Sequence, residues 1–381
     1  MTSTTEQIPV FKPYLGPEVH QAASSALEAG WLGLGPLTRQ FEQALQEYLG
    51  RPDRPVVATS SGTAAVHLAC LLAGVGPGDE VIMPSFTYIA GHQAAGMTGA
   101  DIVLCDVEEQ TLGADPESIR SLLSSRTKAI VVTHYAGFPC QLDEILRIGR
   151  EHGIRVIDDA AHALGSRSAG RPIGGFGDLS CFSFGPVKII TSLEGGAVVA
   201  STAEEVQPLH EWRMLGVDQD TAARYARGRA WEYDVTRQGY RYHLGSVPSA
   251  IGLSQLRMID TFIENRRAYC RHYDQAFADL PLRRFEGGYD DVSPFIYVIR
   301  LPDRETRGRL ITHLAERGVQ TGIHWALAAH HFTQYKSCRR GELPVTERAC
   351  DQVLTLPLHS FMEPATLERV VDGVRGFFGA A

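Results

Sequence analysis

Short apolar runs alternate with helix-like stretches from about residue 55 to residue 200. The runs PVVATS, DEVIMPS, ADIVLCDV, KAIVVTHY, GIRVIDDAA and CFSF are strand-like, and segments such as TAAVHLACLLAGV and LDEILRIGREHG have helical spacing. Strands that read as continuous apolar runs, with helices between them, indicate a mainly parallel sheet covered by helices on both faces. Sites in such sheets lie at the carboxyl ends of the strands.

The pattern changes on either side of this layer. Residues 16–30 and 37–49 have helical spacing, and a glycine stands at the end of each segment. Beyond about residue 205, residues 259–280 predict a long helix, residues 294–301 a strand and residues 304–318 another helix. We therefore predict an α/β protein in which residues 1–245 form an N-terminal segment and a large domain. Residues 246–381 then form the long connecting helix and a smaller C-terminal α/β domain.

Composition and charge exclude several classes of protein. The 381 residues are 44% hydrophobic and 21% charged, which is typical of a globular protein. The net charge of −8 argues against a general nucleic-acid binder, and no apolar run reaches the roughly 18–20 residues of a membrane span. The start, MTSTTEQIPVFKP, lacks the charged-then-apolar order of a signal peptide. The seven cysteines are scattered without a CxxC pair, so we expect no metal site, no disulfide framework and a cytoplasmic location.

One lysine has an unusual setting. The chain contains only four lysines, and Lys188 lies within CFSFGPVKIITSLEGG, flanked by apolar residues and followed by a glycine pair. Burial lowers the pKa of a lysine because the charged form loses its water, and a neutral amine is what Schiff-base chemistry requires. This setting favours a catalytic lysine. The alternative is an ordinary buried salt-bridge partner.

Polar residues at predicted strand ends suggest a phosphate site. Gly62, Thr63 and Ala64 follow two serines in SSGTAA, at the start of a predicted helix. Free N–H groups at a helix start, together with hydroxyls and a small glycine, form an anion site. The alternative is plain capping of that helix by a hydroxyl side chain. Ser183, five residues before Lys188, can reach the same phosphate.

Two further strand ends carry an aromatic residue and a carboxylate. Tyr88 follows the strand VIM, where its ring can stack on a planar group or belong to the core. Asp158 and Asp159 end the strand RVIDD, and His162 follows. A carboxylate there can hold a protonated ring nitrogen, cap the next helix, or bind a metal with His162. Metal sites usually have more ligands than this, so we do not predict one.

Together these features match one cofactor. An SGT turn, an aromatic residue, an aspartate at a strand end, and then a serine and a lysine are the layout for pyridoxal phosphate held as a lysine Schiff base. The chain resembles the DegT/StrS sugar aminotransferases, within the fold-type I pyridoxal-phosphate enzymes. The resemblance covers nearly the whole chain and is most specific from residue 178 to residue 196. It is carried by AGWLGLGP with Phe41 and Glu42, SSGTAA, GDEVIMPSFTY, VTHYAG, DDAAHA, GDLSCFSFGPVK, EGGAVV, GYRYHL and IHWALAAHH.

The resemblance implies a role for each candidate residue. Lys188 forms the Schiff base and moves the proton between the donor Cα and C4′ of the cofactor. Asp159 pairs with the pyridinium nitrogen, His162 contacts the ring oxygen, and Tyr88 stacks on the ring. The phosphate is held by Thr63, Ser183 and the backbone of Gly62 and Ala64. The large domain is accordingly the cofactor-binding domain of a fold-type I aminotransferase.

The resemblance also implies a homodimer with shared active sites. Relatives complete the phosphate site from the neighbouring subunit with a segment that here reads GYRYH. Arg241 and His243 are both plausible donors, and which of them reaches the phosphate is open. His330 matches a histidine expected near the sugar, although the residues before it are Ala328 and Ala329 rather than the usual Pro-Leu.

The implied reaction moves an amino group from L-glutamate to a keto group of a nucleotide-linked deoxysugar. The segment HYAG at residues 134–137 favours the 4-keto over the 3-keto position. A keto-cyclitol acceptor is an alternative that shares every cofactor residue. Dehydratase relatives lack the lysine, so Lys188 argues against that activity, and the intact cofactor set argues against a non-catalytic regulator. The nucleotide, the stereochemistry of the amine and the pathway are left open.

Overall fold

The large sheet lies at the centre of the fold. The computed structural model describes residues 7–218, 228 and 231–379. In this part of the chain, the strands of the main sheet are β1 (Val56–Thr59), β2 (Glu80–Pro84), β3 (Asp101–Cys105), β4 (Thr127–Thr133), β5 (Arg155–Asp159), β8 (Leu179–Ser183), β9 (Gly196–Val199) and β11 (Arg339–Arg340). Their order is β1-β9-β8-β5-β4-β2-β3-β11. Among these strands only β9 runs opposite to the rest, so the predicted mainly parallel sheet is confirmed.

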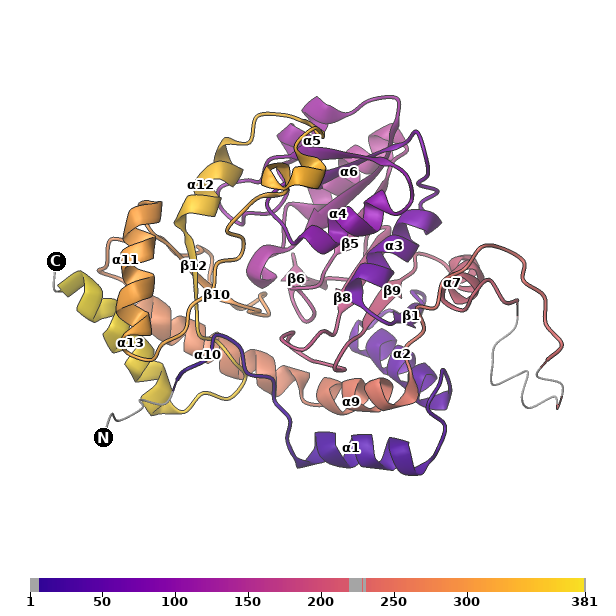
Figure 1. The fold of residues 1–381 in the computed structure, drawn as a ribbon, viewed down its shortest axis with the longest axis horizontal. Coiled ribbons are helices and arrows are strands. Elements are labelled where there is room, and N and C mark those ends of the chain that lie inside the picture. Colours follow the sequence, from indigo (N-terminus) through magenta and orange to yellow (C-terminus); the bar gives the residue numbers. More distant parts are fainter. Residues whose placement is uncertain (1–6, 219–227, 229–230, 380–381) are drawn as a thin grey trace.

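Helices cover the sheet on both faces (Figure 1). One face carries α3 (Gly62–Leu72), α4 (Ile89–Gly96) and α7 (Val206–Arg213), and the other carries α2 (Pro36–Tyr48), α5 (Pro116–Leu122) and α6 (Leu142–His152). The apolar strand residues explain this arrangement, because neighbours along a strand point to opposite faces. Val156 and Ile157 of β5, for example, belong to two separate buried clusters.

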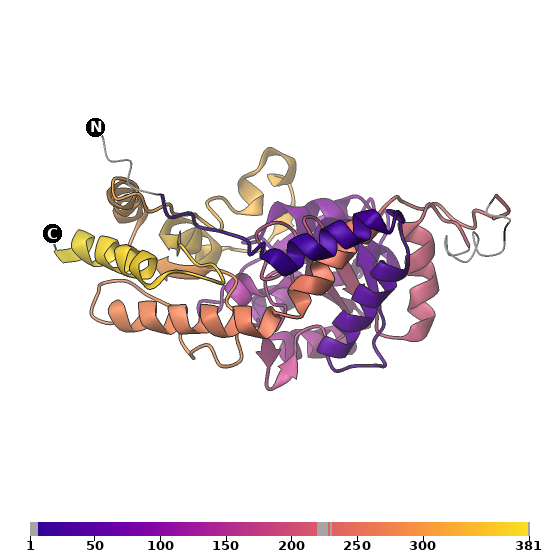
Figure 2. The same ribbon diagram turned by 90° about the horizontal axis from the view of Figure 1, so that it is seen from below.

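The C-terminal third packs beside this layer. It contains α9 (Ser246–Leu256), the long α10 (Ile259–Ala276), α11 (Arg304–Ala315), α12 (Pro344–Gln352) and α13 (Pro364–Gly379). The strands β10 (Tyr297–Arg300) and β12 (Val353–Leu356) pair antiparallel. Figure 2 shows α10 extending away from the sheet towards the end where the C-terminus lies. The predicted long helix is confirmed, and a domain boundary at residue 245 stays a prediction.

The remaining elements are small or peripheral. The helix α1 (Pro17–Glu28) packs against α9, and β6 (Arg167–Ser168) pairs with β7 (Arg171–Pro172). Among the described helices, none is both long and apolar enough to span a membrane. All seven cysteines carry free thiols, and only Cys338 is even partly exposed.

Candidate active site

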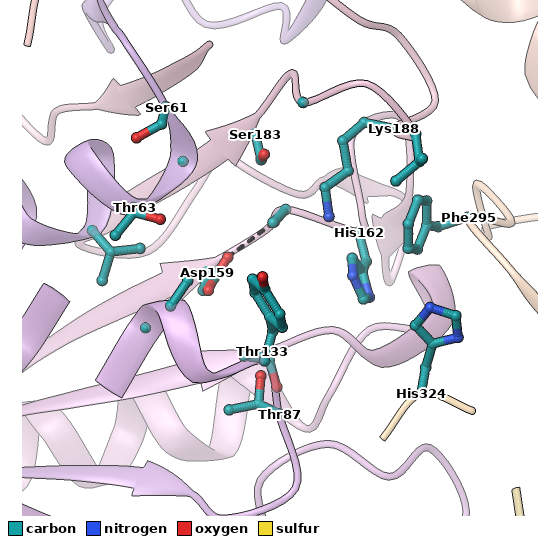
Figure 3. Close-up of a pocket in the computed structure, with 18 of the residues that line it drawn as sticks. Ser61, Thr63, Thr87, Thr133, Asp159, His162, Ser183, Lys188, Phe295 and His324 are labelled. Atoms are coloured by element: carbon teal, nitrogen blue, oxygen red, sulfur yellow. Dashed lines mark hydrogen bonds between the residues drawn. The ribbon is translucent and has the colours of Figure 1, made fainter. Parts of the chain in front are cut away.

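A cavity of about 440 Å³ opens at the carboxyl ends of the central strands, where such sheets place their sites. Its size is in the range of small-ligand pockets. The start of α3 and the ends of β4, β5 and β8 form one side, and residues of the C-terminal third close the other (Figure 3). Of the predicted site residues, those that line the cavity are Gly62, Thr63, Tyr88, Asp159, His162, Ser183 and Lys188. Their roles towards a cofactor stay predictions.

The start of α3 has the properties of an anion site. Ser61 caps the helix, because its Oγ accepts the Ala64 N–H at 3.1 Å. The capping alternative is therefore correct for Ser61. In the described structure, however, the N–H groups of Gly62 and Thr63 have no acceptor and remain available to a ligand. Gly62 lies directly against Ser183, where a Cβ on residue 62 would be only 2.7 Å from the Ser183 Cβ.

The Lys188 amine is largely surrounded by protein. A turn closed by the Lys188 N–H and the Gly185 carbonyl, 3.2 Å apart, brings the side chain back over the strand ends. Burial lowers the pKa of Lys188 to about 8, against a smaller opposing effect of Asp159. The amine lies 4.5 Å from the centre of the Phe295 ring. None of the salt bridges found among the described residues involves Lys188, and the charge that raises its pKa is that of Asp159.

Asp159 faces the same space as Lys188 (Figure 3). Its Oδ1 accepts the Ala161 N–H at 3.1 Å. Burial raises the pKa of Asp159, while the Ala161 amide and the positive charge of Lys188 lower it. A carboxylate buried in this way is stabilised by a cationic N–H placed against it.

Aromatic rings form the wall beyond the lysine. The His162 and Phe295 rings lie 4.1 Å apart between centroids, with an interplanar angle of 31°. Burial and the Lys188 charge hold the pKa of His162 well below its ordinary value, so the imidazole is neutral. Tyr88 stacks on Trp325 at 5.2 Å and is 59% exposed, which places it at the mouth of the cavity.

The sequence reasoning missed the residues that the C-terminal third contributes. Phe295, His324 and Trp325 line the cavity. The His324 Nδ1 lies 2.8 Å from the Thr355 Oγ1, and burial lowers the pKa of His324 to about 4. The segment IHW was a signal for the last two residues, because it belongs to the family resemblance. Phe295 had no signal, since it is one apolar residue in a strand-like run.

Four predicted residues are not among those that line the cavity of this chain, namely Ala64, Arg241, His243 and His330. Arg241 is exposed and His243 is half-buried. The two tyrosines that alternate with them stack on each other at 5.1 Å. His330 contacts the Ser85 Oγ through Nδ1 at 2.8 Å and Glu347 through Nε2 at 2.7 Å.

The comparisons with known proteins agree with this geometry. A model of the DegT/DnrJ/EryC1/StrS aminotransferase family matches residues 13–375. The aminotransferase TlmJ from Streptoalloteichus hindustanus has 34% identity and a TM-score of 0.89, over 98% of this chain and 99% of that one. DesV from S. venezuelae has 30% identity and a TM-score of 0.89 over the same shares.

A more distant solved structure has an equally close fold. The putative sugar aminotransferase Spr1654 from Streptococcus pneumoniae, in its PMP form, has 26% identity and a TM-score of 0.91 over 98% of this chain and 99% of that one. A match of the family model to nearly the whole chain, together with relatives at or above 30% identity, is sufficient to place the protein. The chain is an aminotransferase, and it belongs to the DegT/DnrJ/EryC1/StrS aminotransferase family.

Proposed function

We propose that the protein transfers the amino group of L-glutamate to a keto group, at the 4-position, of a nucleotide-linked deoxysugar, with pyridoxal phosphate as cofactor. The single observation that carries this proposal is the content of the cavity. A desolvated lysine and a buried aspartate face one space, and the start of α3 offers unpaired N–H groups at its end.

The residues present fit pyridoxal phosphate. The Gly62–Ser183 contact leaves no space at the helix start for another side chain, and the free N–H groups of Gly62 and Thr63 suit phosphate oxygens. In this proposal Asp159 accepts a ring N–H, and Lys188 binds an aldehyde carbon. When bound, the cofactor supplies an electron sink for the charge left on the donor Cα as its proton departs.

Lys188 performs the proton transfers in this proposal. With its pKa lowered by burial to about 8, the amine is neutral near neutral pH far more often than that of an ordinary lysine, and the neutral form can accept a proton. Positioned proton transfer of this kind contributes roughly 10²–10⁴-fold to the rate. Asp159 keeps the ring nitrogen protonated, and the neutral His162 can donate one N–H towards the ring oxygen without adding a second positive charge beside Lys188.

The sugar acceptor is supported by relatives rather than by a bound ligand. Spr1654 is described as a putative sugar aminotransferase, and CalS13 from Micromonospora echinospora, with 28% identity, is described as a sugar aminotransferase. The mouth of the cavity suits a polar substrate with apolar ring faces, because Tyr88, Trp325 and His324 combine aromatic surface with a ring nitrogen. The glutamate donor, the 4-keto position and the substrate contact of His330 remain proposals.

A homodimer in the cytoplasm belongs to the same proposal. Arg241 and His243 do not line the cavity of their own chain, and Arg241 is exposed while His243 is half-buried. Arg241 at a partner's cofactor phosphate would supply the positive side chain that the start of α3 lacks. Burial and the charges of Arg241 and Arg213 lower the pKa of His243, so His243 would act there as a neutral N–H donor.

The test is a pair of half-reactions followed by absorbance. The enzyme is converted to its amino form with L-glutamate, freed of excess donor, and offered TDP-4-keto-6-deoxyglucose. Return of the original cofactor absorbance supports the proposal. If glutamate reacts normally but the sugar does not restore the original cofactor absorbance, the proposed acceptor is wrong. The next acceptors to test are then 3-keto sugars, sugars linked to other nucleotides, and keto-cyclitols. If Lys188→Ala enzyme turns over normally, the whole assignment is wrong.

A further inference from the structure

A buried polar cluster lies behind the strand end that carries Asp159. The His134 Nε2 is 2.5 Å from the Asp158 Oδ1, and the side chains are 0% and 4% exposed. The Ser180 Oγ donates to the Asp158 Oδ2 at 3.2 Å. His134 is the first residue of the HYAG segment, and Asp158 is the first aspartate of DDAAHA. No role has been assigned to either side chain so far.

This cluster lies on the face of the sheet opposite to Asp159. β4 and β5 are parallel, with Val132 opposite Asp158 and Thr133 opposite Asp159. Because side chains alternate between faces, Asp159 points to the cavity face with α3 and α4. Asp158 then points to the face covered by α5 and α6, where His134 meets it.

The hydrogen bonds determine the charge of the pair. The Cys140 backbone N–H donates to the His134 Nδ1 at 3.0 Å, so that nitrogen is an acceptor and carries no proton. The ring proton is therefore on Nε2, facing Asp158. Burial disfavours a charged His134 ring, but Asp158 raises the pKa of His134 above its ordinary value. A second ring proton would have to lie on Nδ1, where it would face the Cys140 N–H, so the pair holds one proton and keeps a net negative charge next to Asp159.

We propose that His134, Asp158 and Ser180 form a positioning unit. Its buried negative charge increases the proton affinity of two groups in the cavity, the cofactor ring nitrogen opposite Asp159 and the Schiff base formed by Lys188. The unit acts through Asp159 and does not touch the substrate. His134 is among the residues that line the cavity, but its ring nitrogens face the Cys140 N–H and the Asp158 carboxylate. The inference rests on the proposed function, since the protons concerned belong to the cofactor site.

The direction of the effect follows from the charges around Asp159. Burial raises the pKa of Asp159, and the negative charge of Asp158 acts in the same direction, whereas the Ala161 amide, Lys188 and His134 lower it. The same charge would favour the protonated form of a cofactor ring nitrogen opposite Asp159 and of a Schiff base formed by Lys188. The charged or titratable groups that interact with the unit are Arg54 from the loop before β1, Cys140 before α6, Asp159 on β5, His162 after β5 and Cys181 on β8.

The test compares variants that remove the charge with variants that keep it. Enzyme saturated with pyridoxal phosphate is titrated with base, and the midpoint of the change in cofactor absorbance is measured. Asp158→Asn removes the charge at nearly constant shape, and we expect its midpoint to fall by about 0.5–1 pH unit. Ser180→Ala keeps the charge and loses one contact, so its midpoint should stay within about 0.3 pH unit of wild type.

Each outcome decides the matter. An unchanged midpoint in Asp158→Asn overturns the inference, and so does an equal fall in Ser180→Ala. If Asp158→Asn does not fold, His134→Gln replaces it. That variant keeps the Asp158 charge and should keep the wild-type midpoint. A shift of the midpoint by more than about 0.5 pH unit would contradict the inference. Wild-type protein without any cofactor absorbance would instead refute the proposed function itself.

Discussion

The contact between Gly62 and Ser183 allows a sharp test of the phosphate site through Gly62→Ala. A Cβ on residue 62 would lie 2.7 Å from the Ser183 Cβ and 3.0 Å from its Oγ. Carbon atoms in ordinary contact are about 3.5–4.0 Å apart, so the two segments must separate by close to an ångström. Rotation of the serine side chain cannot relieve the contact, because the Ser183 Cα is itself only 3.3 Å away.

Two opposing effects determine the cost of this substitution. Overpacking of a close contact costs about 1–3 kcal/mol, whereas alanine favours a helix over glycine by at most ~1 kcal/mol. The cofactor-free protein should therefore lose roughly 1–2 kcal/mol of unfolding free energy. Separation of the helix start from Ser183 also weakens hydrogen bonds to a charged phosphate, worth about 1.5–3 kcal/mol each. The loss of one such bond weakens cofactor affinity about 10- to 100-fold.

Urea unfolding of the cofactor-free protein measures the first effect, and titration with pyridoxal phosphate followed by absorbance measures the second. The double variant Gly62→Ala with Ser183→Gly is the matched control. It removes the opposing Cβ, so part of the lost stability should return, although the Ser183 Cα stays 3.3 Å away, while affinity stays reduced through the lost hydroxyl. Wild-type stability together with wild-type affinity in Gly62→Ala would refute the reasoning.

Three further predictions concern the lysine, the dimer and a buried cation. Lys188→Ala should fold but lose the covalent cofactor absorbance and turnover. Without cofactor, the wild type should gain stability relative to this variant as pH rises above about 8. The reason is that the folded-state pKa of Lys188 lies below its unfolded value of 10.5, so the unfolded state binds more protons in this range. A pH-independent stability difference would contradict this. Arg241→Ala or His243→Ala should release the cofactor faster on gel filtration, and unchanged retention in both would remove the intersubunit role. Arg266 donates to three backbone carbonyls and a serine, so Arg266→Met should cost about 2–4 kcal/mol in urea unfolding, and a cost below 1 kcal/mol would contradict that.

Local patterns were sufficient for the sheet and for one half of the site. Continuous apolar strands separated by helices require a covered parallel sheet, and such a sheet brings its strand ends to one edge. Gly62, Asp159, Ser183 and Lys188 all follow or end a predicted strand, so their meeting could be foreseen from chain order. Each element needed only its own residues to be recognised.

The other half of the site depends on contacts between distant segments. Phe295 is more than 100 residues beyond Lys188, and nothing in its neighbourhood shows that its ring will cover that amine. The sequence could not show that the His134 side chain lies against Asp158, because that contact joins the ends of two different strands. Nor could it show that His330 contacts Ser85, which is far away along the chain. Patterns along the chain predict which way an element faces, but packing between elements far apart in sequence determines which side chains finally touch.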